Sequence, residues 1–145
     1  MKTDRILIVA DNSSSSIKAI RYGFSLAEEL KAKVALLYVI EPGLAEGNVD
    51  AGIFPDDALK KLRTKARSFL QRIKKKYGKD IDIELMTPYG EISTITANIA
   101  KDWDARLLIT GTHGRTGLSK LLNGSVAESI IHNSPVPVCV VQMDK

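Results

Sequence analysis

The chain has 145 residues, of which 44% are hydrophobic and 26% charged, and its formal net charge is +4. A chain of this length forms one domain with a substantial core, and no apolar run approaches the ~18 residues that cross a bilayer. We therefore expect a single domain over residues 1–145 without a membrane span. The amino terminus lacks the long apolar segment and cleavage site of a signal peptide, which predicts a cytoplasmic protein.

Short β-branched runs alternate with longer amphipathic segments, a pattern typical of βαβ units. The predicted strands, in chain order, are Arg5 to Ala10, Lys33 to Ile40, Ile81 to Met86, Ala105 to Thr110 and Val136 to Val141. The predicted helices are Ser14 to Lys31, Pro55 to Tyr77, Glu91 to Asp102 and Ser125 to about Asn133. Most strands are nearly continuous apolar runs, which indicates that helices cover both faces of the sheet.

These elements predict an α/β fold, a single doubly wound and Rossmann-like domain with a five-stranded parallel sheet. Right-handed crossovers make the strands parallel, and we expect the strand order 3-2-1-4-5. Ligands of such folds bind at the carboxyl ends of the strands, where the strand order reverses. The candidate site therefore lies at the loops that follow the first and fourth strands, which begin with Asp11 and Gly111.

The loop after the fourth strand, GTHGRTGLSKLLNGS at residues 111–125, is rich in glycine. Glycine lets a bulky anion approach backbone amides, and the amino end of the following helix carries a positive dipole. Arg115 and Lys120 add positive charge, which favours a phosphate site. The spacing matches neither the Walker pattern nor the dinucleotide pattern. Ser125 and Glu128 also have capping-box spacing, so a purely structural interpretation of the loop stays open.

The spacing Gly111-x2-Gly114-x9-Gly124-Ser125 resembles the G-x2-G-x9-G-[S/T] pattern of the ATP-binding branch of the universal stress protein family. The resemblance continues in ILIVADNSxxS, LLYVIE and SPVPVCVV, and so covers nearly the whole chain. Asn12 stands where the family usually has glycine, and Arg106 stands where an aspartate often precedes the fourth strand. Asparagine tolerates left-handed backbone, so we expect the first turn to be kept. The resemblance implies a fold of the adenine nucleotide alpha hydrolase type.

The resemblance also implies a role for individual residues in binding ATP. Asp11 would lie beside the nucleoside, where a carboxylate suits ribose hydroxyls, and the backbone of Val39 would face the adenine. The residues implied to border the ribose and the first phosphates are Thr110, Gly111, His113 and Gly114. Those implied to hold the outer phosphates are Gly124, Ser125 and Val126. We add Arg115 on its charge alone, and we expect any Mg²⁺ to be held largely by the phosphates.

Two of the polar features have simpler interpretations. Asp11 could cap the helix that begins near Ser14, because the run SSSS is ordinary first-turn chemistry; the family pattern favours the ligand role. The basic stretch from Lys60 to Lys79 could contact nucleic acid, but its cations are spread around the helix, so a solvated helix face is favoured. The residues expected to form the buried stripe of this helix are Leu59, Leu62, Ala66, Phe69 and Ile73.

The last predicted strand lies at an edge of the sheet, yet it has the composition of a covered strand. Its single cysteine, Cys139, is expected to be a buried and inert thiol. Pro137 removes one backbone donor, but it leaves residues 138–142 able to pair with another strand. An exposed apolar edge invites such pairing, so we expect a homodimer through Val136–Val141, as the resemblance also implies.

Three functions stay open at this stage. The chain could be an ATP-binding regulatory or stress-response protein that signals to an unidentified protein partner, a slow ATPase, or an interaction module whose glycine loop is only structural. Hydrolysis requires groups that position water and stabilise charge on the γ-phosphate. The candidates are His113, Ser125 and nearby basic residues, and no partner base is evident. We therefore expect ATP binding with little or slow hydrolysis.

Overall fold

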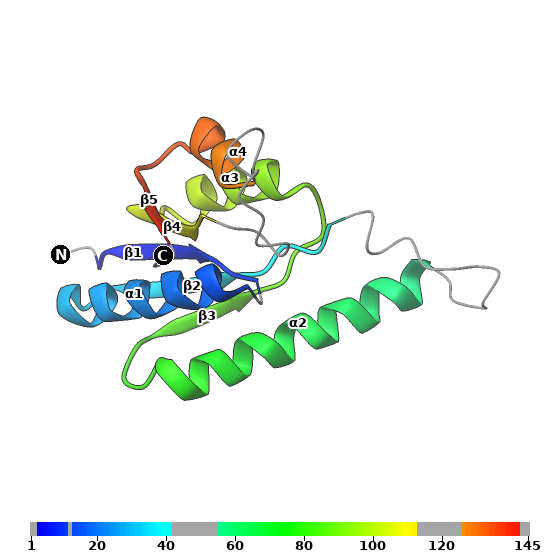
Figure 1. Cartoon of the computed structure of the whole chain (residues 1–145), viewed down its shortest axis with the longest axis horizontal. Coiled ribbons are helices and arrows are strands. Elements are labelled where there is room, and N and C mark those ends of the chain that lie inside the picture. The colour runs from blue at the N-terminus through cyan, green and yellow to red at the C-terminus, as the bar shows by residue number, and fades with distance from the viewer. Residues whose placement is uncertain (1–2, 12, 42–54, 113–125, 143–145) are drawn as a thin grey trace.

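A five-stranded parallel sheet forms the centre of the described structure, with helices on both faces (Figure 1). The structure is a computed structural model that describes residues 3–11, 13–41, 55–112 and 126–142. The strands are β1 (Arg5–Val9), β2 (Lys33–Leu37), β3 (Ile83–Met86), β4 (Leu107–Gly111) and β5 (Val138–Val141). The helices are α1 (Ser14–Leu30), α2 (Pro55–Tyr77), α3 (Ile92–Asp102) and α4 (Val126–Asn133).

The strand order is β3-β2-β1-β4-β5, and each neighbouring pair is parallel, so the predicted fold class and topology are confirmed. In the central strand, Ile6 pairs with Val34 of β2 and with Leu107 of β4. The chain moves outward in one direction from β1 to β3 and in the other from β4 to β5. The order therefore reverses between β1 and β4, which is where a ligand site is expected.

Two core clusters explain why the central strands are apolar throughout. Ile6 and Ile8 of β1 pack in a cluster with buried side chains of α1 and α2, whereas Leu7 and Val9 pack in a cluster with Ala100 of α3 and Ile130 of α4. Successive side chains of a strand point to opposite faces, so both sets must be apolar when helices cover both faces. Among the described helices, none is long and apolar enough to cross a membrane.

The strands begin and end at slightly different residues from those predicted. β4 begins at Leu107 rather than Ala105, because Asp104 adopts a φ of 60° and the Ala105 N–H donates to the Ala100 carbonyl of α3 at 2.9 Å. β5 begins at Val138 rather than Val136, because the Ser134 hydroxyl donates to the Val136 carbonyl at 2.7 Å and holds a turn there. The pattern of apolar residues in the sequence does not reveal such tertiary and turn contacts, so it did not predict where these strands begin.

Two predictions about burial need correction. In α2, Ala66 and Ile73 are buried as predicted, but Leu70 is fully buried and was missed, while Phe69 is only partly buried. The ring of Phe69 instead packs edge-on against Tyr38, with the ring centroids 6.0 Å apart. The predicted stripe members Leu59 and Leu62 are also only partly buried. Cys139 is partly buried rather than buried, because an edge strand has a neighbour on one side only.

Candidate functional site

A small cavity of about 30 Å³ lies where the strand order reverses. Its walls come from the carboxyl ends of β1 and β4 and from the first residues of α4. Four of the predicted site residues line it, namely Asp11, Thr110, Gly111 and Val126. A cavity of this volume holds little more than a water molecule, so it forms the base of a candidate site rather than a complete nucleotide pocket.

Asp11 is held in place by the first turn of α1. Its N–H donates to the Ser16 hydroxyl at 2.7 Å, and its Oδ1 accepts from the Ser13 N–H at 2.7 Å. Ser13, not Asp11, is the N-cap of α1, because its hydroxyl accepts from the Ser16 N–H at 3.2 Å. Within the described residues, Oδ2 of Asp11 accepts no hydrogen bond. This partly buried carboxylate therefore retains an acceptor for a ligand hydroxyl.

Gly111 is required here by the packing of α1 against the end of β4. A Cβ at this position would lie 2.8 Å from the backbone carbon and oxygen of Ser15 in the first turn of α1. Its neighbour Thr110 is only 5% exposed, and the Thr110 hydroxyl donates to the Gly111 carbonyl at 3.4 Å. The two residues thus form a wall of the cavity, and Thr110 does not offer an exposed donor.

Val39 lies two residues past the end of β2 and does not line the cavity. The N–H groups of its neighbours Tyr38 and Ile40 donate to the carbonyls of Met86 and Pro88, at 2.9 and 2.8 Å. Backbone groups alternate in direction along an extended chain, so the N–H and carbonyl of Val39 face away from β3. Within the described part of the chain neither group is hydrogen-bonded, although the residue is buried. Unpaired backbone groups on a residue this buried are candidates for pairing with a ligand.

The amino end of α4 brings backbone N–H groups to the cavity. Val126 and Ala127 line the cavity from the first turn of this helix. The first N–H groups of a helix have no partner within it, and the helix dipole makes this end favourable for an anion. The other predicted phosphate-side residues lie outside the described residues: His113, Gly114, Arg115, Gly124 and Ser125.

Five residues that line the cavity were not predicted as site residues, namely Val9, Ala10, Ser16, Ile92 and Ala127. Ser16 holds the backbone of Asp11, and Ile92 closes the cavity from the first turn of α3. Ser16 is the last serine of the SSSS run, which was interpreted only as helix capping, and nothing in the sequence around Ile92 distinguishes it from a core residue. Within the described residues, no three of the His, Cys, Asp and Glu side chains lie close enough together to hold a metal ion.

Comparison with known proteins places these features in a family context. The model of the universal stress protein family matches residues 2–142. Universal stress protein MJ0531 of Methanocaldococcus jannaschii is 31% identical, over 97% of this chain and 83% of the relative. The solved structure of MJ0577 from the same organism superimposes with a TM-score of 0.84 at 26% identity, over 100% of this chain and 99% of the other. A universal stress protein in complex with cAMP gives a TM-score of 0.68 at 22% identity, with 98% of each chain covered.

Proposed function

Because this chain belongs to the universal stress protein family, we propose that it binds ATP at the carboxyl edge of its sheet and acts as a nucleotide-dependent regulatory or stress-response protein. The observation that carries this proposal is the convergence of Asp11 and the amino end of α4 on one cavity where the strand order reverses. The complex of a universal stress protein with cAMP, an adenine nucleotide, supports the choice of ligand class.

In the proposed complex, each part of the nucleotide meets a different chemical group. The N–H and carbonyl of Val39 pair with a ring nitrogen and the exocyclic amine of adenine, which satisfies both buried backbone groups. Asp11 accepts from the ribose hydroxyls through the carboxylate oxygen that α1 does not use. The amino end of α4 and the glycine loop, including Gly114, Gly124 and Ser125, hold the phosphates. Mg²⁺ enters with the nucleotide, bound to phosphate oxygens.

Calorimetric titration of ATP into Asp11→Ala tests the role of the carboxylate. A hydrogen bond to a charged group contributes about 1.5–3 kcal/mol, so ATP should bind at least about tenfold more weakly. The matched control is Asp4→Ala, because Asp4 pairs with the exposed Arg106 at the start of the sheet. It should leave the affinity for ATP unchanged, and circular dichroism should show that both variants are folded.

The ligand provides a second, independent arm of the same experiment. Dideoxy-ATP, which lacks both ribose hydroxyls, should bind the wild-type protein as weakly as ATP binds Asp11→Ala. The substitution should then have no further effect on dideoxy-ATP, because each change removes the same interaction. If Asp11→Ala weakens the binding of both nucleotides equally, Asp11 acts by holding the loop at the start of α1. The proposed contact between Asp11 and the ribose would then be wrong. If the wild-type protein binds no ATP, the whole proposal is wrong.

We further propose that bound ATP is hydrolysed slowly. Phosphoryl transfer needs a group that orients the attacking water. The described residues that line the cavity include no histidine and no carboxylate besides Asp11. Phosphate release should therefore be far slower than the ~1–100 s⁻¹ of kinases. A steady-state rate within that range, abolished by Ser125→Ala, would instead identify the chain as an ATPase. The cytoplasmic location stays a prediction from the sequence.

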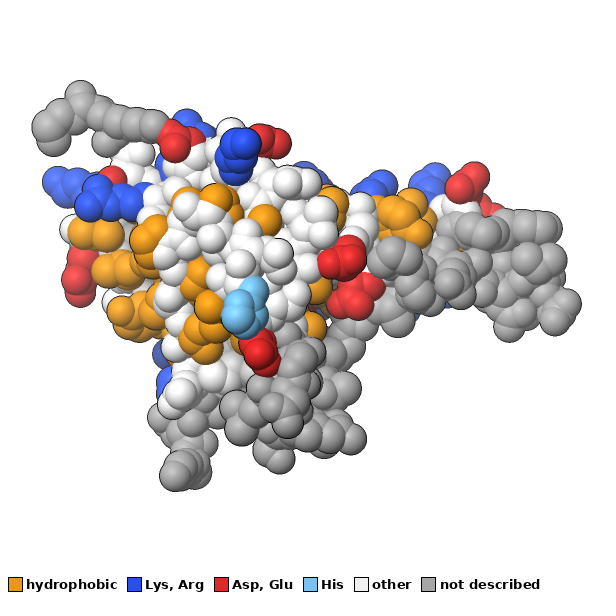
Figure 2. Space-filling model, turned by 90° about the horizontal axis from the view of Figure 1, so that it is seen from above, with side chains coloured by type: hydrophobic (Ala, Val, Ile, Leu, Met, Phe, Trp, Pro, Cys, Tyr) orange, Lys and Arg blue, Asp and Glu red, His pale blue; other side chains and the backbone are white. Residues whose placement is uncertain are grey.

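The proposal also includes a homodimer formed through β5. β5 ends the strand order, and all four of its residues are partly exposed in the single chain. Hydrophobic side chains gather on the face that carries α3 and α4 (Figure 2). Ile131 of α4 contributes to the apolar surface with 48% exposure. A second copy paired along β5 would cover the open edge of the sheet. The protein partner that responds to the bound nucleotide stays unidentified.

A further inference from the structure

The positive charge of the chain is concentrated on one helix. α2 contains nine of the 21 lysine and arginine residues but only two carboxylates, Asp56 and Asp57, whereas the whole chain has a net charge of only +4. Within the described part of the chain, no ion pair joins a cation of α2 to a carboxylate. These cations are therefore available to an anionic partner.

Several of these cations line a groove rather than a convex surface. The groove has a volume of about 580 Å³ and lies between the carboxyl half of α2 and β3. Its cations are Arg67, Lys74, Lys75 and Lys79, and its floor is formed by Ile83 and Leu85. We call it the α2–β3 groove. A second hollow of about 310 Å³, which shares Arg67, continues along the helix past Lys60 and Arg63.

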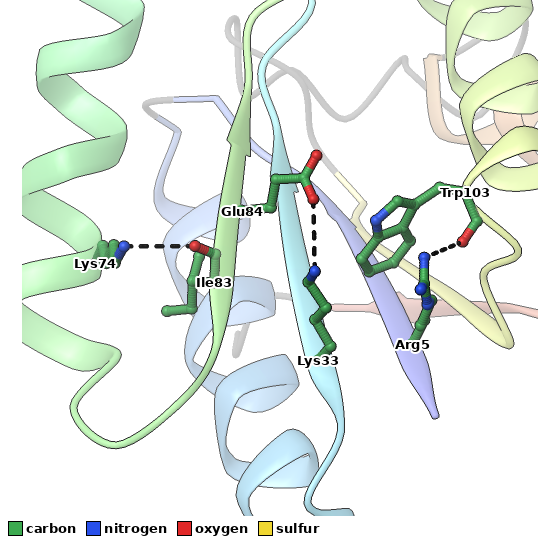
Figure 3. Close-up of polar contacts among 6 residues, drawn as sticks. All are labelled: Arg5, Lys33, Lys74, Ile83, Glu84 and Trp103. Carbon is green, nitrogen blue, oxygen red and sulfur yellow. Dashed lines mark hydrogen bonds and ion pairs between the residues drawn. The ribbon is translucent and has the colours of Figure 1, made fainter. Parts of the chain in front are cut away.

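The α2–β3 groove follows the open edge of the sheet. β3 ends the strand order, and Figure 3 shows Lys74 of α2 reaching the Ile83 carbonyl, with Nζ and oxygen 3.4 Å apart. Arg63 Nε likewise donates to the Thr87 carbonyl at 3.1 Å. These two carbonyls face the open edge of the sheet. Backbone groups of successive residues in a strand point alternately to one edge and the other, so the N–H and carbonyl of Leu85 also face the open edge. The groove thus offers backbone hydrogen-bonding groups beside a row of cations.

From these observations we propose that the α2–β3 groove binds an extended acidic segment of a partner protein. The segment lies along β3, pairs with the backbone of Leu85, and directs its carboxylates toward Arg67, Lys75 and Lys79. Main-chain pairing with a sheet edge is a general mode of peptide recognition, and the cations select for acidic side chains. The described residues that line the groove include no aromatic ring on which bases could stack, which disfavours single-stranded nucleic acid. This interaction is independent of the proposed nucleotide site.

Fluorescence anisotropy with a labelled peptide tests this inference on the full chain. The probe is a peptide of about twelve residues that alternates glutamate with threonine, and the reference probe has glutamine in place of glutamate. The wild-type protein should bind the acidic peptide and not the reference peptide. Arg67→Glu combined with Lys75→Glu should weaken binding by about tenfold or more, since two attractive charges become repulsive.

The matched control reverses two charges on the opposite flank of the same helix. Lys61→Glu combined with Lys65→Glu makes the same change in net charge at exposed residues that do not line the groove. At physiological salt the Debye length is about 8 Å, so this variant should bind the peptide within about twofold of wild type. Equal loss in both variants would overturn the proposal in favour of unspecific attraction. Absence of peptide binding would also overturn it. So would tight binding of oligouridylate that is abolished by Arg67→Glu combined with Lys75→Glu but not by the control variant.

Discussion

At the scale of single residues, Gly111 belongs to a motif that predicts phosphate binding, but in the structure its lack of a side chain is required by packing. The sequence pattern groups Gly111 with Gly114 and Gly124. In the structure, the first turn of α1 lies so close to the end of β4 that no Cβ fits at residue 111. The next residue of α1, Ser16, accepts a hydrogen bond from the Asp11 N–H at 2.7 Å. The glycine therefore shapes the site by allowing α1 to pack, whatever the ligand contacts.

We predict that Gly111→Ala destabilises the protein. Its Cβ would lie 2.8 Å from the Ser15 backbone, which cannot move without shifting the start of α1. Overpacking of this kind costs about 1–3 kcal/mol of unfolding free energy. Urea unfolding can be followed through the fluorescence of Trp103, the single and largely buried tryptophan. The exposed Ser25→Ala in α1 is the control, and an unchanged urea midpoint for Gly111→Ala would show that α1 can relax.

At the scale of the elements, the four serines of the SSSS run have different tasks. Ser13 caps α1 with its hydroxyl, Ser15 packs against Gly111, and Ser16 accepts from the Asp11 N–H. Ser14, in contrast, is exposed at the start of the helix. The start of α1 is therefore both a helix cap and the support of the candidate site. The cap that the sequence offered as an alternative role for Asp11 belongs to Ser13 instead.

We predict that Ser13→Ala and Ser14→Ala differ in stability. Ser13→Ala removes the hydroxyl that accepts from the Ser16 N–H at 3.2 Å, and loss of a cap costs about 1 kcal/mol. Ser14→Ala should change the unfolding free energy by less than about 0.5 kcal/mol, because it alters an exposed position. Thermal unfolding monitored by circular dichroism compares the two. Equal melting temperatures would mean that another group caps α1.

The order of the elements was predictable because it depends on patterns within each segment. Continuous apolar runs such as ILIV in β1 identify strands covered on both faces, and crossover geometry then fixes their order. The lining of the candidate cavity was predictable at the carboxyl ends of strands, as for Gly111, the last residue of β4, and Asp11, two residues past the end of β1. Contributions from packed helices were not predictable, because Ser16 and Ile92 reach the cavity through tertiary packing. Strand ends were missed for the same reason, as with the Ala105 N–H that turns back to α3.

At the scale of the whole molecule, Pro137 does not interrupt the free edge of β5. Pro137 was expected to remove a donor from this edge. Its carbonyl instead accepts from the Leu108 N–H of β4 at 2.9 Å, so the backbone of Pro137 faces inward. Alternation then directs the N–H and carbonyl groups of Val138 and Val140 outward. The edge thus offers two complete pairs of backbone groups to a second copy, and two-fold pairing satisfies both copies at once.

We predict that the protein is a homodimer and that Val140→Lys dissociates it. Val140 is partly exposed and belongs to neither of the two core clusters, so lysine should be tolerated in the folded monomer. Across a two-fold axis the substitution brings like charges to the same edge, a device by which edge strands avoid pairing. The control is Leu30→Lys, which changes a leucine that is 49% exposed at the end of α1. Light scattering after gel filtration should give twice 15.9 kDa for wild type and Leu30→Lys, and 15.9 kDa for Val140→Lys. A wild-type monomer at tens of micromolar would contradict the dimer, whereas a dimer that survives Val140→Lys would locate the contact away from β5.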